Sequence, residues 1–377
     1  MYFRSPLVIG LIVVILVLLA VGLAAWQFVS IKSTGTPLGP AMRLPRHIGQ
    51  IIVTTERYLP TLHRNPGKDR YRLDLLVISL DDPTRQETFP LLRQQQSNAL
   101  QPLTKILGAD GDVVWIQALE IFAVNLKTKR IAGEADLRKA NPELAQFLHS
   151  AKPQFTDRFV AVAADGSSAY EFSGETLKAN ACPPPARGSW LDEQFSNRIE
   201  GSLCSGGLIS ATEWIAVATA EDARSDFKPG FSLPRDFTAG EKDRKRQLYR
   251  GTADTSQTRP PIRNSQRISE TEYRAATFLR AKPGGTLLRA TDPDTVFLLH
   301  RPGTELFAPL TLTRLAPGGN AIWNSATGIG RLTQVLPGAD CIALIGERPP
   351  VPNRVPEPIL VLINLTTGTP NTISLWR

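Results

Sequence analysis

The chain has 377 residues and carries a net charge of +8, with 43 Lys and Arg against 35 Asp and Glu. Its hydrophobic content of 42% is sufficient for a substantial core and excludes a largely disordered chain. The basic excess favours anionic partners, but aromatic residues make up only 7% of the chain and are not interleaved with basic ones, so nucleic-acid binding is not predicted.

The N-terminal region contains a long apolar run from Leu7 to Phe28, in which Gln27 is the only polar side chain. As a helix these 22 residues would span about 33 Å, against about 30 Å for the hydrocarbon core of a bilayer. Aromatic side chains flank the run on both sides, as Tyr2 and Phe3 at one end and Trp26 at the other. We therefore expect residues 1–31 to form a membrane anchor. A cleaved signal peptide is the alternative, but its apolar region should be only about 7 to 15 residues long.

The orientation of this anchor is predicted from the size of the flanking segments, because basic residues lie on both sides of it. Only six residues precede the apolar run and a large domain follows, and large domains are translocated largely regardless of charge. We expect a single-pass protein of the bacterial cytoplasmic membrane with a periplasmic domain. No cysteine ends the apolar run, so a lipoprotein anchor is not expected. Residues 32–46, rich in Pro and Gly, are predicted to be a spacer.

Residues 47–377 are predicted to form an all-β domain, because short β-branched runs alternate with turn residues. The clearest predicted strands are Ile51–Thr55, Tyr71–Leu80, Val113–Ile116, Phe159–Ala163, Trp214–Ala218, Val296–Leu299, Ile342–Ile345 and Ile359–Leu365. Two short helices are also predicted. Asn141 and Pro142 are typical of a helix start, and Ser269 with Glu272 matches a capping box for a helix toward Arg280.

An internal repeat links several of these strands. Acidic residues precede four of them, at Asp112, Asp157, Asp294 and Asp340, and the intervals 157 − 112 = 45 and 340 − 294 = 46 match the repeat of a four-stranded propeller blade. A second template is shared by Val124–Lys129 and Ile363–Gly368, with a looser copy at Ile78–Thr84. Each copy is expected to be a strand that enters a tight turn.

These segments resemble the blades of quinoprotein-like and WD40-like β-propellers, such as those of membrane-anchored bacterial propeller proteins. The likeness is carried by Ala123–Lys129, Leu362–Gly368, and Leu315–Gly319 followed by Trp323, whereas Trp-Asp dipeptides are missing. The resemblance implies a propeller, and the length allows six or seven blades. A pair of irregular β-sandwiches is the alternative. A closed propeller is expected to pair the strand near Ile51 in one sheet with Ile359–Trp376.

Residues 235–268 are predicted to be a basic loop inserted in this domain, because they carry 9 − 4 = +5 of the net charge and no clear strand pattern. Five cations in it are candidate contacts for anionic lipid or an acidic protein: Lys242, Arg244, Lys245, Arg246 and Arg250. A solvated loop without a partner is the alternative, and in either case trypsin should cut here first.

Few residues suggest chemistry. Cys182 and Cys204 could form a disulfide or remain free thiols, and Cys341 is expected to be a buried apolar residue. The four histidines, at 47, 63, 149 and 300, share no metal-ligand spacing, and Asp292 with Asp294 supplies too few oxygens for calcium. No catalytic, cofactor or metal site is predicted.

Three functions are compatible with these features. The first is a membrane-anchored interaction or scaffold protein that contacts another envelope protein. The second is a propeller enzyme, a quinoprotein-type oxidoreductase or a hydrolase, with its site at the central mouth, which the resemblance permits and no residue supports. The third is a ligand sensor.

Overall fold

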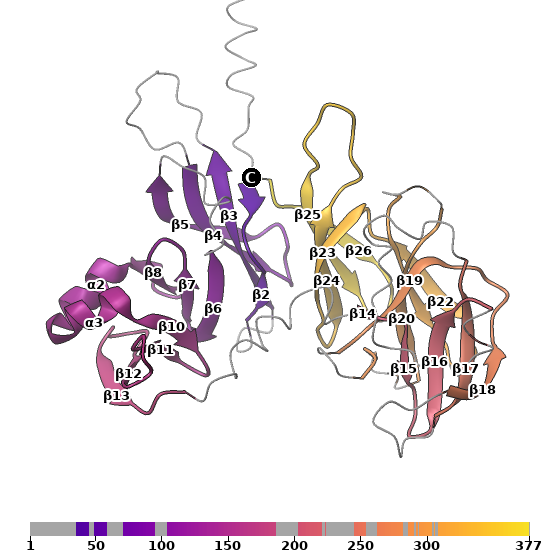
Figure 1. The fold of residues 1–377 in the computed structure, drawn as a ribbon. Coiled ribbons are helices and arrows are strands. Elements are labelled where there is room, and N and C mark those ends of the chain that lie inside the picture. Colours follow the sequence, from indigo (N-terminus) through magenta and orange to yellow (C-terminus); the bar gives the residue numbers. More distant parts are fainter. Residues whose placement is uncertain are drawn as a thin grey trace, which may run out of the picture.

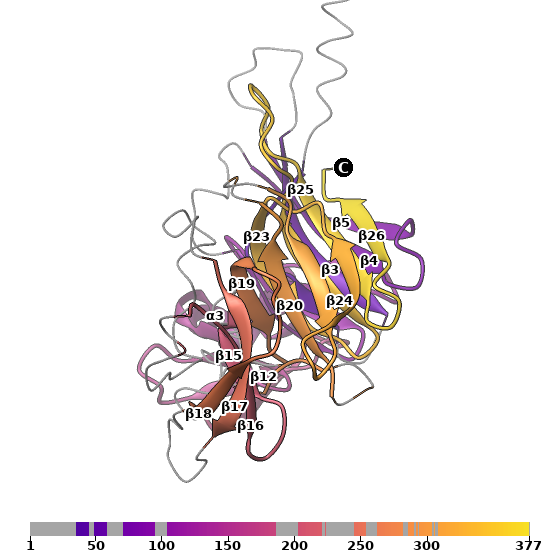
Figure 2. The same cartoon turned by 90° about the vertical axis from the view of Figure 1, so that its right-hand side faces the viewer.

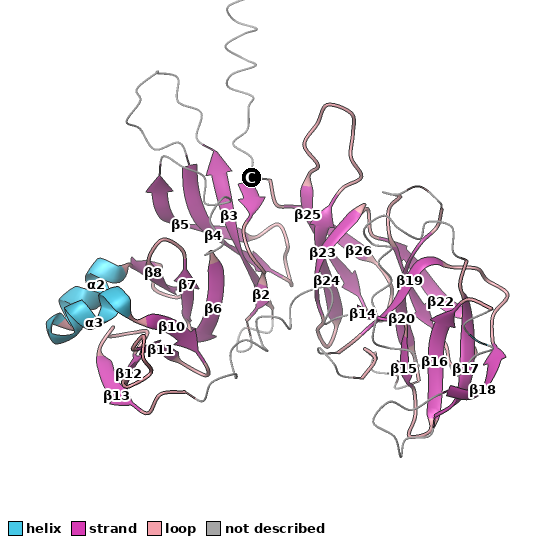
Figure 3. Ribbon diagram, viewed as in Figure 1, coloured by secondary structure: helices cyan, strands magenta, loops and turns pink. Residues whose placement is uncertain are grey.

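The computed structural model describes residues 35–44, 49–58, 71–94, 104–185, 203–220, 223, 245–253, 262–281, 286–289, 292, 294–303, 305 and 308–376. These residues are mostly β, as predicted. Their strands form six antiparallel sheets, which we number 1 to 6 in chain order (Figure 1), and two short α-helices lie beside the second and third sheets (Figure 3).

The first half of the chain forms sheets 1 to 3. Sheet 1 contains β1 (Gly35–Pro37), β2 (Met42–Arg43), β3 (Gln50–Tyr58), β4 (Tyr71–Ser79) and β5 (Gln86–Gln94). Sheet 2 contains β6 (Lys105–Asp110), β7 (Val113–Gln117), β8 (Ile121–Asn125) and β9 (Arg130–Ala132). The helical connection α2 (Glu134–Ala140), η2 (Pro142–Leu144) and α3 (Ala145–Ser150) follows. Sheet 3 contains β10 (Lys152–Phe155), β11 (Phe159–Val162), β12 (Ala169–Phe172) and β13 (Ala179–Cys182).

The second half forms sheets 4 to 6. Sheet 4 contains β15 (Gly206–Leu208), β16 (Glu213–Ala218), β17 (Gln247–Ala253) and β18 (Ile262–Arg267). Sheet 5 contains β19 (Arg274–Leu279), β20 (Val296–Arg301), β21 (Thr311–Leu315) and β22 (Ala321–Ala326), and β14 (Leu203–Cys204) pairs with β19 at its edge. Sheet 6 contains β23 (Arg331–Leu336), β24 (Cys341–Glu347), β25 (Pro358–Asn364) and β26 (Pro370–Ser374).

The repeat seen in the sequence corresponds to equivalent positions in different sheets. The four predicted acidic residues come shortly before β7, β11, β20 and β24, which begin at Val113, Phe159, Val296 and Cys341. The strand-to-turn template is also confirmed. The Asn125 side-chain oxygen accepts hydrogen bonds from the N–H groups of Lys127 and Thr128, and Asn364 does the same for Thr366 and Thr367. Asparagine is suited to this turn because its side chain can replace a backbone acceptor.

Three elements differ from the sequence-based predictions. Residues 35–43, assigned to the spacer, instead pair with β3, and Leu38 and Ala41 are buried there. Within the predicted basic loop, residues 247–253 and 262–267 are strands of sheet 4, in which Leu248 is buried and Arg250 forms an ion pair with Glu213. The helix predicted after Ser269 is wrong, because Arg274–Leu279 is a strand in which Ala276 and Phe278 face one core and Leu279 faces another.

The sheets pack side by side in the order 3, 2, 1, 6, 5, 4. Buried clusters join sheet 1 to sheet 2, sheet 2 to sheet 3, sheet 4 to sheet 5, sheet 5 to sheet 6, and sheet 6 to sheet 1. Among the described residues, no buried cluster joins sheet 3 to sheet 4. The six sheets therefore form an arc, with sheets 1 and 6 adjacent in its middle and sheets 3 and 4 at its two ends (Figures 1 and 2).

The predicted pairing of the first and last strands in one sheet is wrong. β3 lies in sheet 1 and β25 and β26 lie in sheet 6, because β1 and β2 already occupy the edge of β3 that a C-terminal strand would need. The two sheets are joined by side chains instead. Ile51 and Ile78 pack with Leu360 and Leu362, and the Gln334 amide accepts from the Ala41 N–H and donates to the Ala41 carbonyl, both at 2.8 Å.

Candidate functional site

A pocket of about 610 Å³ lies at the boundary between sheets 2 and 3, at the end where β8 turns into β9. Sheet 2 contributes Asp112, Ala123, Asn125, Lys127, Thr128, Arg130 and Ala132, and the β12–β13 turn of sheet 3 contributes Gly174, Glu175 and Leu177. The volume falls in the range of roughly 300 to 1,000 Å³ that is typical of ligand sites.

The pocket exists because side-chain size changes along the boundary. At the inner end, Trp115 and Phe159 are fully buried and stack with ring centroids 4.1 Å apart, with Phe172 beside them. On the neighbouring strands β8 and β9, the residues in register with Trp115 are Ala123 and Ala132, and both are buried. Two methyl groups cannot fill the space that large side chains would, so the floor of the pocket is apolar and recessed.

The wall of the pocket opposite sheet 2 is the β12–β13 turn of sheet 3, and the close approach of the two sheets fixes its position. A side-chain carbon at Gly174 would lie 2.8 Å from the Val113 side chain, so only glycine fits there without movement. The next residues of the turn, Glu175 and Leu177, are thereby held against sheet 2. Leu177 is buried and completes the floor, while Glu175 is exposed at the rim.

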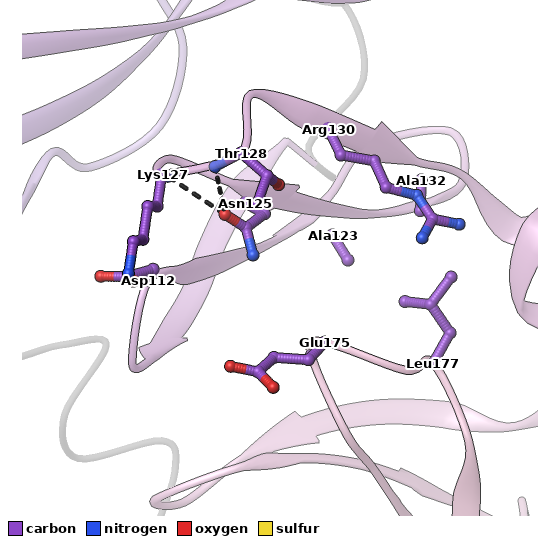
Figure 4. A pocket seen from close by; sticks show the side chains of 10 residues that line it. Asp112, Ala123, Asn125, Lys127, Thr128, Arg130, Ala132, Glu175 and Leu177 are labelled. Atoms are coloured by element: carbon purple, nitrogen blue, oxygen red, sulfur yellow. Dashed lines mark hydrogen bonds between the residues drawn. The ribbon is translucent and has the colours of Figure 1, made fainter.

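The rim carries charges of both signs. Lys127 and Arg130 are exposed on the sheet 2 side, and Glu175 faces them from sheet 3 (Figure 4). Within the described part of the chain, none of these three side chains forms an ion pair. The Lys127 and Thr128 N–H groups are instead used in the Asn125 turn, at 3.1 and 2.8 Å, so the loop that carries the cations is ordered.

This arrangement is suited to binding a ligand that has both charged and apolar groups. Exposed charges keep their solvation and can exchange water for a ligand group at low cost, and the recessed apolar floor can accept a hydrophobic side chain. In the described residues no group of three or more His, Cys, Asp or Glu side chains is placed to hold a metal ion.

The basic residues singled out from the sequence are separated by the structure. Lys242 and Arg244 lie outside the described residues. Lys245 forms an ion pair with Glu272 at 2.7 Å, and Arg250 forms one with Glu213 at 2.7 Å. The backbone of Arg246 pairs with Tyr273, which joins sheet 4 to the start of sheet 5. These described cations therefore stabilise sheet 4, and any contact of this region with an anionic partner stays a prediction.

The cysteines are all free thiols, and the disulfide considered between Cys182 and Cys204 is not formed. Cys182 is on β13 of sheet 3 and Cys204 is on β14 at the edge of sheet 5, and no buried cluster among the described residues joins those sheets. Burial raises the pKa of the Cys204 thiol, which keeps it protonated and unreactive at neutral pH.

Other predicted features fall in different places. The anchor Leu7–Phe28, His47 and His63 lie outside the described residues, and the part of the chain that is described contains no helix of the length and apolarity needed to cross a membrane. His300 is largely buried and its Nε2 is 2.9 Å from the Thr313 hydroxyl. Asp292 and Asp294 form a turn, in which the Asp294 N–H donates to the Asp292 carboxylate.

Sequence reasoning did not find the pocket residues. It recognised Val124–Lys129 as a turn template, but Arg130 and Glu175 are 45 residues apart and meet only because sheets 2 and 3 pack together. The one signal in the sequence was the pair of alanines in strands otherwise built from large side chains. That signal has meaning only once the two strands are known to be paired.

No protein-family model matches the chain, and no curated protein matches it. Among solved structures, the β-propeller domain of the Trilobed protease from Pyrococcus furiosus is 9% identical, with a TM-score of 0.32, and the alignment covers 91% of this chain and 98% of that one. An acylaminoacyl peptidase from Pyrococcus horikoshii is 11% identical, with a TM-score of 0.28, and the alignment covers 92% of this chain and 53% of that one.

The tricorn protease is 9% identical, with a TM-score of 0.21, and the alignment covers 88% of this chain and 30% of that one. This chain thus spans about half the length of the acylaminoacyl peptidase and less of the tricorn protease. At these TM-scores none of the three carries weight for the fold or the activity of this chain. The resemblance to propeller blades rests on its own six sheets and their strand order.

Proposed function

We propose that this chain is an interaction protein of the cell envelope, anchored in the cytoplasmic membrane by Leu7–Phe28, whose six propeller-like sheets hold a peptide segment of a partner protein in the pocket between sheets 2 and 3. The observation that carries the proposal is the pocket itself, with exposed charges of both signs above an apolar floor. An extended peptide offers the matching features, because it can place an apolar side chain on the floor and charged side chains at the rim.

The pocket proposal is tested by selecting phage-displayed peptides on the full-length protein held in nanodiscs. Ala132→Leu fills the floor, and Ala326→Leu is the matched control because Ala326 is exposed on β22. We expect selected peptides to bind with micromolar affinity to the wild type and to the control, and to bind at least tenfold more weakly to Ala132→Leu. Equal binding to both variants would place the peptide site elsewhere and overturn the proposal.

The location is tested separately with alkaline phosphatase fused after residue 45 or at the C terminus, since that reporter is active only outside the cytoplasm. Activity at both positions is expected. Extraction should require detergent, because a 22-residue helix with Gln27 as its only polar side chain is retained by the bilayer. Inactive fusions would reverse the proposed orientation, and release by a carbonate wash would show that the anchor is cleaved.

A further inference from the structure

The connection between β24 and β25 exposes apolar side chains on a rigid loop. It runs from Arg348 to Glu357 and contains four prolines, at 349, 350, 352 and 356. Val351 is 54% exposed and Val355 is 75% exposed, the latter being the most exposed large apolar residue among those described. Single exposed apolar side chains are ordinary, but exposed apolar side chains that cluster mark protein or membrane interaction sites.

The loop is held in one shape by its own backbone. The Arg354 N–H donates to the Val351 carbonyl at 3.1 Å, and Asn353 has a φ of 62°, as a type II turn with proline at its second position requires. At the base, the Arg348 N–H donates to the Glu357 carbonyl at 2.9 Å, and the Arg348 and Glu357 side chains form an ion pair at 2.8 Å. Val351 and Val355 are therefore presented in a fixed arrangement rather than on a chain free to fold back.

This loop projects from the end of the molecule at which the described chain begins. Gly35 pairs with Arg57 near the end of β3. The starts of β3 and β24 lie together at the opposite end, because Arg43 pairs with Ile51 and donates from its guanidinium to the Cys341 carbonyl at 3.2 Å. The far ends of β3 and β24 consequently share one face, and both views show the β24–β25 loop extending there (Figures 1 and 2).

Aromatic residues lie on the same face. Tyr58 ends β3, is 43% exposed, and packs edge to face against Tyr71 with ring centroids 5.5 Å apart. Tyrosine rings favour the headgroup level of a bilayer. Arg354, at the tip of the loop, has no ion-pair partner among the described residues, so the face offers apolar, aromatic and cationic groups together.

Resting on the proposed anchor, we infer that this face lies against the membrane surface, with Val351 and Val355 in the headgroup region of the bilayer. The seven residue steps from Phe28 to Gly35 can span at most about 25 Å. The ten-residue loop extends about 16 Å from the sheet, at about 3.3 Å per residue for each of its two arms. The tip therefore reaches the bilayer when the connection holds Gly35 within about 16 Å of it, which is about two thirds of the full extension.

The inference is tested on the full-length protein in nanodiscs of phosphatidylcholine and phosphatidylglycerol, with an NBD label at Val355→Cys. Cys182→Ser and Cys341→Ala remove the two partly exposed thiols, while Cys204 is buried. The matched control is Ile322→Cys, because Ile322 is 49% exposed on β22, just after the β21–β22 turn. Lipids carrying a spin label near the headgroup should quench the label at position 355 at least twice as strongly as the label at 322.

The outcomes separate the two proposals. Protein that stays with the discs but shows equal quenching at positions 355 and 322 would overturn the membrane contact and leave the anchor intact. Protein that does not stay with the discs would overturn both. In discs without phosphatidylglycerol, Arg354→Gln and the wild type should show the same quenching, whereas in anionic discs the variant should be quenched less.

Discussion

The boundary between sheets 2 and 3 and the boundary between sheets 5 and 6 are stabilised in different ways. The first has an aromatic centre, formed by Trp115, Phe159 and Phe172, and a hollow outer end. The second is filled mostly by aliphatic side chains, with Phe297 among them, and has a buried arginine at each end. Arg301 donates to the carbonyls of Ala308 and Gly330, and Arg314 donates to the Leu365 carbonyl at 3.3 Å.

This difference indicates which boundary between repeated sheets can hold a binding site. The arginines of the 5–6 boundary donate to backbone carbonyls of the described residues, so their charged groups are directed into the protein and not toward a ligand. At the 2–3 boundary the charged side chains Lys127, Arg130 and Glu175 remain at the rim instead of bridging the sheets. The 5–6 boundary is thus filled by the protein's own side chains, whereas the 2–3 boundary has a pocket that is available for binding.

The largest expected effect is loss of the aromatic centre. Phe159→Ala should lower the free energy of unfolding by about 3 to 5 kcal/mol, because it removes a fully buried ring and leaves a cavity beside Trp115. Urea denaturation measures the change. Leu119→Ala is the control, since that side chain is 53% exposed, and it should change the stability by less than about 0.5 kcal/mol. A loss below about 1 kcal/mol at Phe159 would mean that the 2–3 boundary depends little on its aromatic centre.

A smaller effect is expected at the 5–6 boundary. Arg301→Met keeps the length and packing of the side chain but leaves the Ala308 and Gly330 carbonyls without donors, which should cost about 1 to 3 kcal/mol. Arg331→Met removes an arginine whose side chain is 65% exposed and pairs only loosely with Glu347, at 3.7 Å, so it should be nearly neutral. If the two variants unfold at the same urea concentration, the hydrogen bonds of Arg301 do not stabilise the 5–6 boundary.

Much of the fold could be predicted from the sequence where strands are buried on both faces. The runs around Val113, Val296 and Ile359 were recognised because branched apolar residues follow one another without interruption. The Asn125 and Asn364 turns were recognised because their chemistry is local. Such patterns can be recognised in the sequence because they do not depend on what packs against the strand.

Strands that carry arginines escaped prediction for the opposite reason. β17 contains Arg250 and β2 contains Arg43, whose charges suggest a solvated segment, yet the Arg43 guanidinium reaches carbonyls of sheet 6 and Arg250 pairs with Glu213. Whether an arginine faces water or a neighbouring sheet is decided by tertiary contacts. The sequence did not predict the pocket for the same reason, since its walls come from two sheets that meet only through tertiary contacts.

The smallest expected effect is a pH dependence of the protein's stability that arises from His300 in sheet 5. His300, at the end of β20, is largely buried, with its Nε2 on the Thr313 hydroxyl and its ring against Tyr273. Burial lowers its pKa below the usual value near 6.5, so the folded protein holds the neutral ring. Above pH 6.5 both states are neutral and the full stability is present. As the pH falls below 6.5, the unfolded chain binds a proton that the folded chain does not, and stability is lost until the pH passes the lowered pKa.

His300→Asn should remove this component of the acid sensitivity, because asparagine can keep a hydrogen bond to Thr313 without titrating. Its stability should therefore fall less than that of the wild type between pH 6.5 and 5.5, by up to about 1.4 kcal/mol for one proton. The control is His149→Asn, since His149 is exposed at the end of α3. Urea denaturation at the two pH values checks the difference. Equal pH dependence in the wild type and His300→Asn would show that the folded and unfolded states bind the His300 proton equally, which would contradict the lowered pKa.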